Sequence, residues 1–72
     1  MNEMLKAARG NRKQKDVAKK VGITAGYYSL IERGERRVTY ELAYDIAKVL
    51  GTTPDAIFLE YQSTKRKQEA AR

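Results

Sequence analysis

The side chains able to do chemistry in this chain of 72 residues are mostly cationic, and they gather in its first half. Residues 1–37 carry ten bases and four acids, residues 38–60 one base and four acids, and residues 61–72 four bases and one acid. The net charge is +6, with no His to change it near neutral pH. This distribution indicates a basic face for an anionic polymer, with the other side turned away from it. The alternative is that the basic residues only solubilise the chain.

The residue types that the chain lacks exclude most catalytic chemistry. Without Cys there is no disulfide, no thiolate nucleophile and no Cys-based zinc site. Without His there is no imidazole base and no histidine metal ligand, and the acids are scattered singly. We therefore expect that the protein is not an enzyme and has no catalytic residues, no metal site, no cofactor and no small-molecule ligand.

The length allows one small domain with a single core. No apolar run approaches the roughly 20 residues that span a bilayer, and the N-terminus lacks the basic start and apolar stretch of a secretory signal. We expect a cytoplasmic protein without membrane contact. Residues 1–60 are expected to form the domain, and residues 61–72 a basic polar tail that is either a frayed helix end or a disordered extension.

Apolar residues recur at helical spacing before this tail, and no stretch alternates as a half-buried strand would. The pattern predicts five helices and no sheet, at about residues 1–8, 13–20, 24–33 and 41–50 and from residue 54. Thr24 and Thr39 are expected to cap the third and fourth helices, and Gly22 and Gly51 to end the second and fourth. The residues expected in the core are Val17, Val21, Ile23, Tyr28, Ile31, Leu42, Ile46, Leu50, Ile57 and Phe58.

Residues 14–33 place two of these helices on either side of a very short turn. Helices joined so closely must cross steeply, so the residue at their closest approach has to be small, as Ala18 is. Gly22 can adopt the backbone conformation that a side chain would resist. The spacing therefore predicts a rigid helix-turn-helix unit.

Two stretches of this unit, QKDVAKKVGIT from Gln14 and SLIERGERR from Ser29, resemble the helix-turn-helix family of phage repressors, Cro proteins and xenobiotic-response-element-type bacterial regulators. The family pattern has Gln opening the second helix, then Val-Ala, Gly-Ile-Ser/Thr and Ser-x-Ile-Glu-x-Gly. The similarity covers roughly residues 5–59. It implies an all-α, compact five-helix, lambda-repressor-like domain that lays its third helix in the DNA major groove and its second across the phosphates.

The resemblance also implies roles for single residues. Gln14 would bind a phosphate, and the arginines that follow the third helix would grip phosphates beyond it. Side chains of the third helix would face bases or the groove wall. Arg9 and Glu32 would form the family's partly buried ion pair. The residues expected to bind DNA are Lys13, Gln14, Lys15, Thr24, Ala25, Gly26, Tyr27, Ser29, Leu30, Arg33, Arg36 and Arg37.

The sequence departs from the family in three places. Ala25 and Gly26 stand where many relatives carry polar side chains, which leaves little direct base readout and shifts specificity toward Tyr27, Ser29, thymine methyl contacts and DNA shape. Tyr28 replaces a smaller Ile or Val. The loop at residues 10–13 is shorter than usual.

Together these observations predict a transcription regulator, and specifically a repressor that acts as a homodimer on a palindromic operator in double-stranded DNA. Two copies are expected because one recognition helix covers only about half a turn of DNA. The family implies a dimer surface at Phe58, Leu59 and Tyr61. Activation through contact with RNA polymerase is equally compatible. The alternative of a different class is a protein-interaction or antitoxin-like module that uses the helix-turn-helix as a scaffold.

Overall fold

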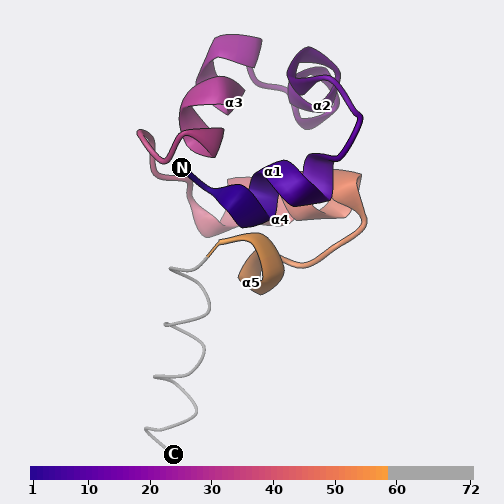
Figure 1. The fold of residues 1–72 in the computed structure, drawn as a ribbon, viewed down its shortest axis with the longest axis vertical. Helices are drawn as coiled ribbons and strands as arrows, with labels where there is room; N and C mark the ends of the chain where they lie inside the picture. Colours follow the sequence, from indigo (N-terminus) through magenta and orange to yellow (C-terminus); the bar gives the residue numbers. More distant parts are fainter. Residues whose placement is uncertain (59–72) are drawn as a thin grey trace, which may run out of the picture.

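A computed structural model describes residues 1–58, which form five α-helices and no strand (Figure 1). The predicted all-α fold is confirmed for this part of the chain, and none of its helices has the length and apolar character that crossing a membrane requires. The predictions for Leu59, Tyr61 and the basic tail fall outside the described residues. The helices are α1 Glu3–Arg9, α2 Gln14–Val21, α3 Ala25–Glu32, α4 Tyr40–Leu50 and α5 Pro54–Ile57.

Side chains at the N-caps explain where three of the helices begin. The hydroxyl oxygens of Thr24 and Thr39 each accept a hydrogen bond of 3.1 Å from the backbone N–H three residues further on, which confirms both predicted caps. The first helix starts at Glu3, later than predicted. Asn2 stays extended and caps this helix, because its side-chain oxygen accepts the N–H of Leu5 at 3.0 Å.

The turn between α2 and α3 depends on the left-handed backbone of Gly22. This residue has φ 93° and ψ 27°, and its N–H donates to the carbonyl of Ala18 at 2.8 Å. The N–H of Ile23 reaches the same carbonyl at 3.0 Å. These two bonds close α2 in the way typical of a glycine-terminated helix, so the chain can reverse and begin α3 within three residues.

The core lies where the helices meet. The pair α2 and α3 packs together, α4 packs against α2 and α5, and α1 packs against α3 and α5. Tyr28 has no exposed surface, which confirms its predicted place in the core despite its size. Three predicted core residues are only partly buried, because they lie at the end of α2, in the turn and in the first turn of α4; they are Val21, Ile23 and Leu42. The buried apolar residues are Leu5, Val17, Ala18, Tyr28, Ile31, Val38, Ala43, Ile46, Ala47, Leu50, Ile57 and Phe58.

The N-terminal residues join opposite ends of this arrangement. In Figure 1 the pair α2 and α3 lies at one end of the described part and α5 at the other, with the N-terminus beside the end of α3. The N–H of Asn2 donates to the carbonyl of Glu32 at 2.7 Å, and its side-chain amide donates to the carbonyl of Ile57 at 2.6 Å. Asn2 therefore ties α1 to the ends of both α3 and α5.

Two glycines near the turn should respond to alanine in opposite ways. A Cβ added at Gly22 or at Gly26 would meet no atom within 4 Å, so only backbone conformation distinguishes them. We expect Gly22→Ala to destabilise the protein by about 1–2 kcal/mol, because its positive φ strains any side chain. We expect the helical Gly26→Ala to stabilise it by about 0.5 kcal/mol. Urea denaturation measures both, and equal effects would contradict the explanation.

Candidate nucleic-acid interface

The carboxylate of Glu32, in the last turn of α3, is the polar centre at which three helices meet. Arg9 donates to it twice, from Nε to Oε2 at 2.6 Å and from Nη2 to Oε1 at 3.2 Å. The Arg9 and Glu32 side chains are 17% and 4% exposed, which confirms the predicted partly buried ion pair. Gln14 Nε2 also donates to Oε1, at 3.0 Å, a partner that the sequence did not predict. One carboxylate thus joins the end of α1, the start of α2 and the end of α3.

These contacts set the charges of the cluster. Burial by itself would raise the pKa of Glu32, but hydrogen bonds from Arg9 and Gln14 outweigh it and hold that pKa below its ordinary value. The hydrogen bond to Glu32 raises the pKa of Arg9 against the effect of burial. Burial, and then the nearby carboxylate of Glu32, raise the pKa of Tyr28, whose hydroxyl is buried. At neutral pH the ion pair is charged and the phenol is neutral.

Gln14 was expected to contact a phosphate, and its side-chain amide is also engaged within the protein. A carboxylate only accepts hydrogen bonds, so Glu32 fixes the amide with its nitrogen inward. That nitrogen carries two hydrogens, and the second remains for another acceptor. The N-cap of α2, Lys13, makes no side-chain capping bond to the first N–H groups of this helix. The start of α2 therefore offers several donors, and the phosphate contact of Gln14 stays a prediction.

A hollow of about 540 Å³ opens beside this cluster, between α1, α2 and α3. It brings together four of the residues predicted to bind DNA, which are Lys13, Gln14, Ser29 and Arg33. Lys6 also lines the hollow and was not predicted. Its spacing of three residues from Arg9 on one helix is the sequence signal that places both on one face. Cations outnumber the single carboxylate here, so the hollow favours an anion.

The remaining predicted contacts of α3 lie on its outer surface. Ala25 and Gly26 are exposed at its start, Tyr27 in the same turn is partly exposed, and so are Ser29 and Leu30 further along. None of the twelve residues expected to bind DNA is buried. The outer surface of α3 is therefore accessible along its length.

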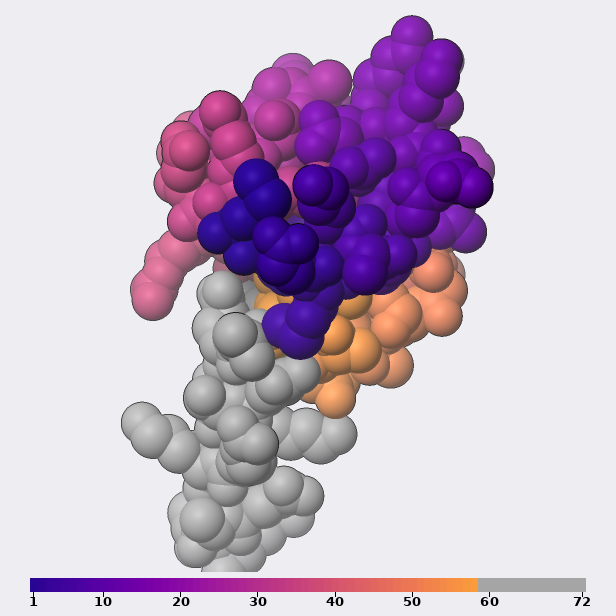
Figure 2. Space-filling view, viewed as in Figure 1, coloured from indigo at the N-terminus to yellow at the C-terminus, as the bar shows by residue number. Residues whose placement is uncertain are grey.

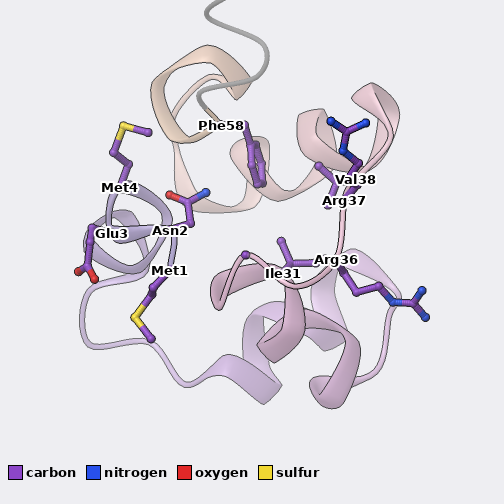
Figure 3. Close-up of a pocket in the computed structure, with 10 residues that line it drawn as sticks. Met1, Asn2, Glu3, Met4, Ile31, Arg36, Arg37, Val38 and Phe58 are labelled. Atoms are coloured by element: carbon purple, nitrogen blue, oxygen red, sulfur yellow. The ribbon is translucent and has the colours of Figure 1, made fainter.

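The three arginines after α3 are held in different ways. Arg33 Nε lies 3.7 Å from Glu35 Oε2 in an exposed ion pair. The guanidinium of Arg36 lies over the ring of Tyr27, with its central carbon 5.5 Å from the ring centroid. In Figure 3 the side chains of Arg36 and Arg37 point in different directions. Both point away from a second groove, which their segment borders and which lies apart from the hollow beside Glu32. Figure 2 shows the pink segment after α3 standing out from the surface.

This second groove, of about 520 Å³, lies between the N-terminal residues, the end of α3 and Phe58 (Figure 3). Its floor is apolar, with Ile31 and Phe58 pointing into it, and Met4 and Val38 also line it. Phe58 is only 4% exposed and belongs to the core, as the apolar pattern predicted. Its part in a dimer surface stays a prediction.

The chain belongs to the helix-turn-helix family, whose sequence model matches residues 5–57. This match confirms the resemblance to the phage repressor and Cro type of regulator. The family binds DNA and is not catalytic, so the chain is a DNA-binding regulator in general terms, which fits the expectation that it is not an enzyme. Comparison with curated proteins and with solved structures gave no match.

Replacing the central carboxylate should destabilise the fold strongly. In Glu32→Gln the partly buried guanidinium of Arg9 loses its counter-charge, and we expect a loss of about 2–3 kcal/mol at pH 7. The matched control is Glu35→Gln, whose exposed pair with Arg33 should contribute less than about 1 kcal/mol. Urea denaturation of both variants measures the difference, and similar losses would show that Glu32 is not the centre of the cluster.

The stability difference between the wild type and Glu32→Gln should depend on pH. Because folding lowers the pKa of Glu32, its contribution is fully present above the pKa of the unfolded chain, about 4.3, and is lost as the pH falls through the lower folded pKa. We therefore expect the stability difference between the wild type and Glu32→Gln to be constant from pH 7 to about pH 5 and to shrink below about pH 4. A difference that grows on acidification would contradict the assigned direction.

Proposed function

We propose that this protein is a sequence-specific, double-stranded-DNA-binding transcription regulator that acts as a repressor, as a homodimer on a palindromic operator. The observation that carries this proposal is the accessible face of α3 with cations beside it. Lys13 and Arg33 lie with Ser29 at one hollow, while Arg36 lies over Tyr27. A rod about 10–12 Å wide matches the major groove, and flanking cations match the phosphates along its edges.

In this proposal the phosphate contacts position the protein. Gln14 offers the second hydrogen of its oriented amide, and the uncapped start of α2 adds backbone N–H groups with the positive end of the helix dipole. Lys13 and Lys15 flank this helix end. Arg33, Arg36 and Arg37 serve the other edge of the groove. These contacts carry no sequence information, so they give affinity that depends strongly on salt.

Sequence preference rests on few polar side chains. The first turn of α3 presents Ala25 and the open surface of Gly26, which allows the helix to approach the bases closely but provides no bidentate hydrogen bond. Ser29 carries the one hydroxyl on the outer surface of α3 apart from the Tyr27 phenol. Leu30 and Ala25 suit thymine methyl groups. We propose that DNA shape supplies the remaining discrimination.

A dimer would give the second half of the binding site. The groove beside Phe58 supports a contact there, because the partly exposed Met4 lines it together with the buried apolar side chains of Val38 and Ile31. Phe58 itself, only 4% exposed, would contribute little surface, together with Leu59 and Tyr61. On a palindrome, the two α3 helices would lie about 34 Å apart, one turn of DNA. Repression follows when the dimer occupies DNA that RNA polymerase needs.

A second function, as a protein-interaction or antitoxin-like module, is favoured by one observation. Large aromatic surface is exposed on α4, where Tyr40 is 59% and Tyr44 51% exposed, while Ala25 and Gly26 at the start of α3 carry no polar side chain. An exposed aromatic pair is typical of protein interfaces. In that case the helix-turn-helix would serve as a scaffold.

A duplex shift assay at about 50 and 200 mM salt separates these two functions. A regulator that contacts six or more phosphates should lose about 1,000-fold or more in affinity across this range. Absence of binding to any duplex at the lower salt concentration would contradict DNA binding and favour the protein partner. Selection of bound fragments from random duplexes then reports the sequence, symmetry and spacing of the site.

Substitutions on either side of α3 should have different consequences. We expect Arg37→Ala to weaken binding to all duplexes similarly and to reduce the salt slope by about one, because it removes a phosphate contact. We expect Ser29→Ala to change the preferred sequence by about 1–3 kcal/mol at one position. Lys48→Ala, which removes an exposed cation in the last turn of α4, is the control and should change neither quantity. A change of preference in Arg37→Ala alone would show that α3 is placed wrongly.

A further inference from the structure

The contact between Tyr27 and Arg36 joins two segments that approach DNA in the proposed function. Tyr27 lies in the first turn of α3, and its N–H is held by the hydroxyl of Thr24 at 3.1 Å. Its ring is partly buried and packs against the core. Arg36 belongs to the segment between α3 and α4 and is exposed. A ring fixed by the core thus supports a cation from a segment without regular structure.

The way in which Arg36 is held leaves its hydrogen-bond donors accessible. A guanidinium is planar, and its five N–H donors lie around its edge. An aromatic ring attracts the cation without pairing its donors with a carboxylate, and Arg36 is exposed, so donors remain available to a phosphate. The neighbouring Arg33 differs, because it directs a donor toward the carboxylate of Glu35. Within residues 1–58, Arg36 forms no ion pair.

We propose that Tyr27 is a positioning residue, whose ring holds the guanidinium of Arg36 at the edge of the α3 surface for a phosphate. Tyr27 then contributes to DNA binding through Arg36 and not through a base. This inference rests on the proposed function and refines it, because Tyr27 was expected among the base-facing residues of α3. The ring lowers the entropy that the long arginine side chain loses when it binds.

The two roles of Tyr27 require different parts of its side chain. Positioning needs the face of the ring, so Tyr27→Phe retains it and Tyr27→Leu removes it while keeping apolar contact with the core. A hydrogen bond to a base needs the hydroxyl, which both variants lack. Positioning also requires Arg36, whereas a base contact does not. The variants and the Arg36→Ala background therefore separate the two roles.

The test measures binding of the full chain to one duplex of about 20 base pairs, long enough for two half-sites, over a series of salt concentrations. We expect Tyr27→Phe to bind within about twofold of the wild type and Tyr27→Leu to bind about two- to fivefold more weakly, with a smaller salt slope. In the Arg36→Ala background, Tyr27→Leu should cause no further loss. Tyr44→Leu, which removes an exposed tyrosine from α4, is the control and should bind as the wild type does.

A second measurement examines the contact without DNA. The side-chain protons of Arg36 should show an upfield ring-current shift in the NMR spectrum of the wild type and of Tyr27→Phe, and lose it in Tyr27→Leu. Circular dichroism establishes that each variant is folded.

The outcomes distinguish this inference from the proposed function. Equal losses from Tyr27→Leu with and without Arg36, or a loss in Tyr27→Phe as large as that in Tyr27→Leu, would overturn the positioning role alone. An Arg36 spectrum that does not change in Tyr27→Leu would do the same. A wild-type protein that binds no duplex at low salt would overturn both the proposed function and the role of Tyr27.

Discussion

The charge of Glu32 constrains how α3 is held against the rest of the molecule. This carboxylate lies in the last turn of its own helix, where the helix dipole disfavours an anion, and only 4% of the side chain is exposed. Arg9, the last residue of α1, and Gln14, the first of α2, supply the compensation. Because a buried charge left without its partner costs roughly 3–5 kcal/mol, a domain of this size keeps all three helix ends together.

The backbone of Glu32 is also held, by the N-terminal residues. The carbonyl of Glu32 accepts the N–H of Asn2, whose side chain also reaches the carbonyl of Ile57. At its other end, α3 is capped by Thr24. Both ends of the helix are thus fixed by hydrogen bonds that do not involve the side chains of its outer surface between them. As a result, positions 25 and 26 need no particular side chain for packing, and the exposed Ala25 and Gly26 are free to serve what they contact.

The sequence predicted those parts of the fold that depend on residues close to one another along the chain. The caps Thr24 and Thr39 and the glycines Gly22 and Gly51 act within four residues of their own positions, so their types reveal their roles. The start of α1 was misplaced because Met1 and Met4 extend the apolar spacing, while the capping role of Asn2 competes with it. The periodic pattern alone cannot decide whether the helix begins at Met1 or only after Asn2.

Contacts between distant segments were less accessible to prediction. The pairing of Arg9 with Glu32, 23 residues apart, followed from the family resemblance and not from spacing. The amide of Gln14 reaches Glu32 only because α2 crosses α3, and Arg36 meets Tyr27 only through the path of the segment between α3 and α4. That segment has no periodicity from which its path could be read. For the proposed interface, the sequence supplied the residue types, whereas the tertiary fold decides which of them act together.

The cations of the proposed interface are held weakly, in contrast to the buried cluster beneath them. The pair of Arg33 with Glu35 is half exposed on both sides, and such pairs contribute at most about 1 kcal/mol, so a phosphate can replace the carboxylate at small cost. A released Glu35 would then repel the DNA backbone, which reduces the affinity for every duplex alike. Specific contacts gain in relative weight when this common attraction is lowered. A rigid helix with loosely engaged charges around it is therefore suited to discriminating among sequences even though its own base-reading side chains are few.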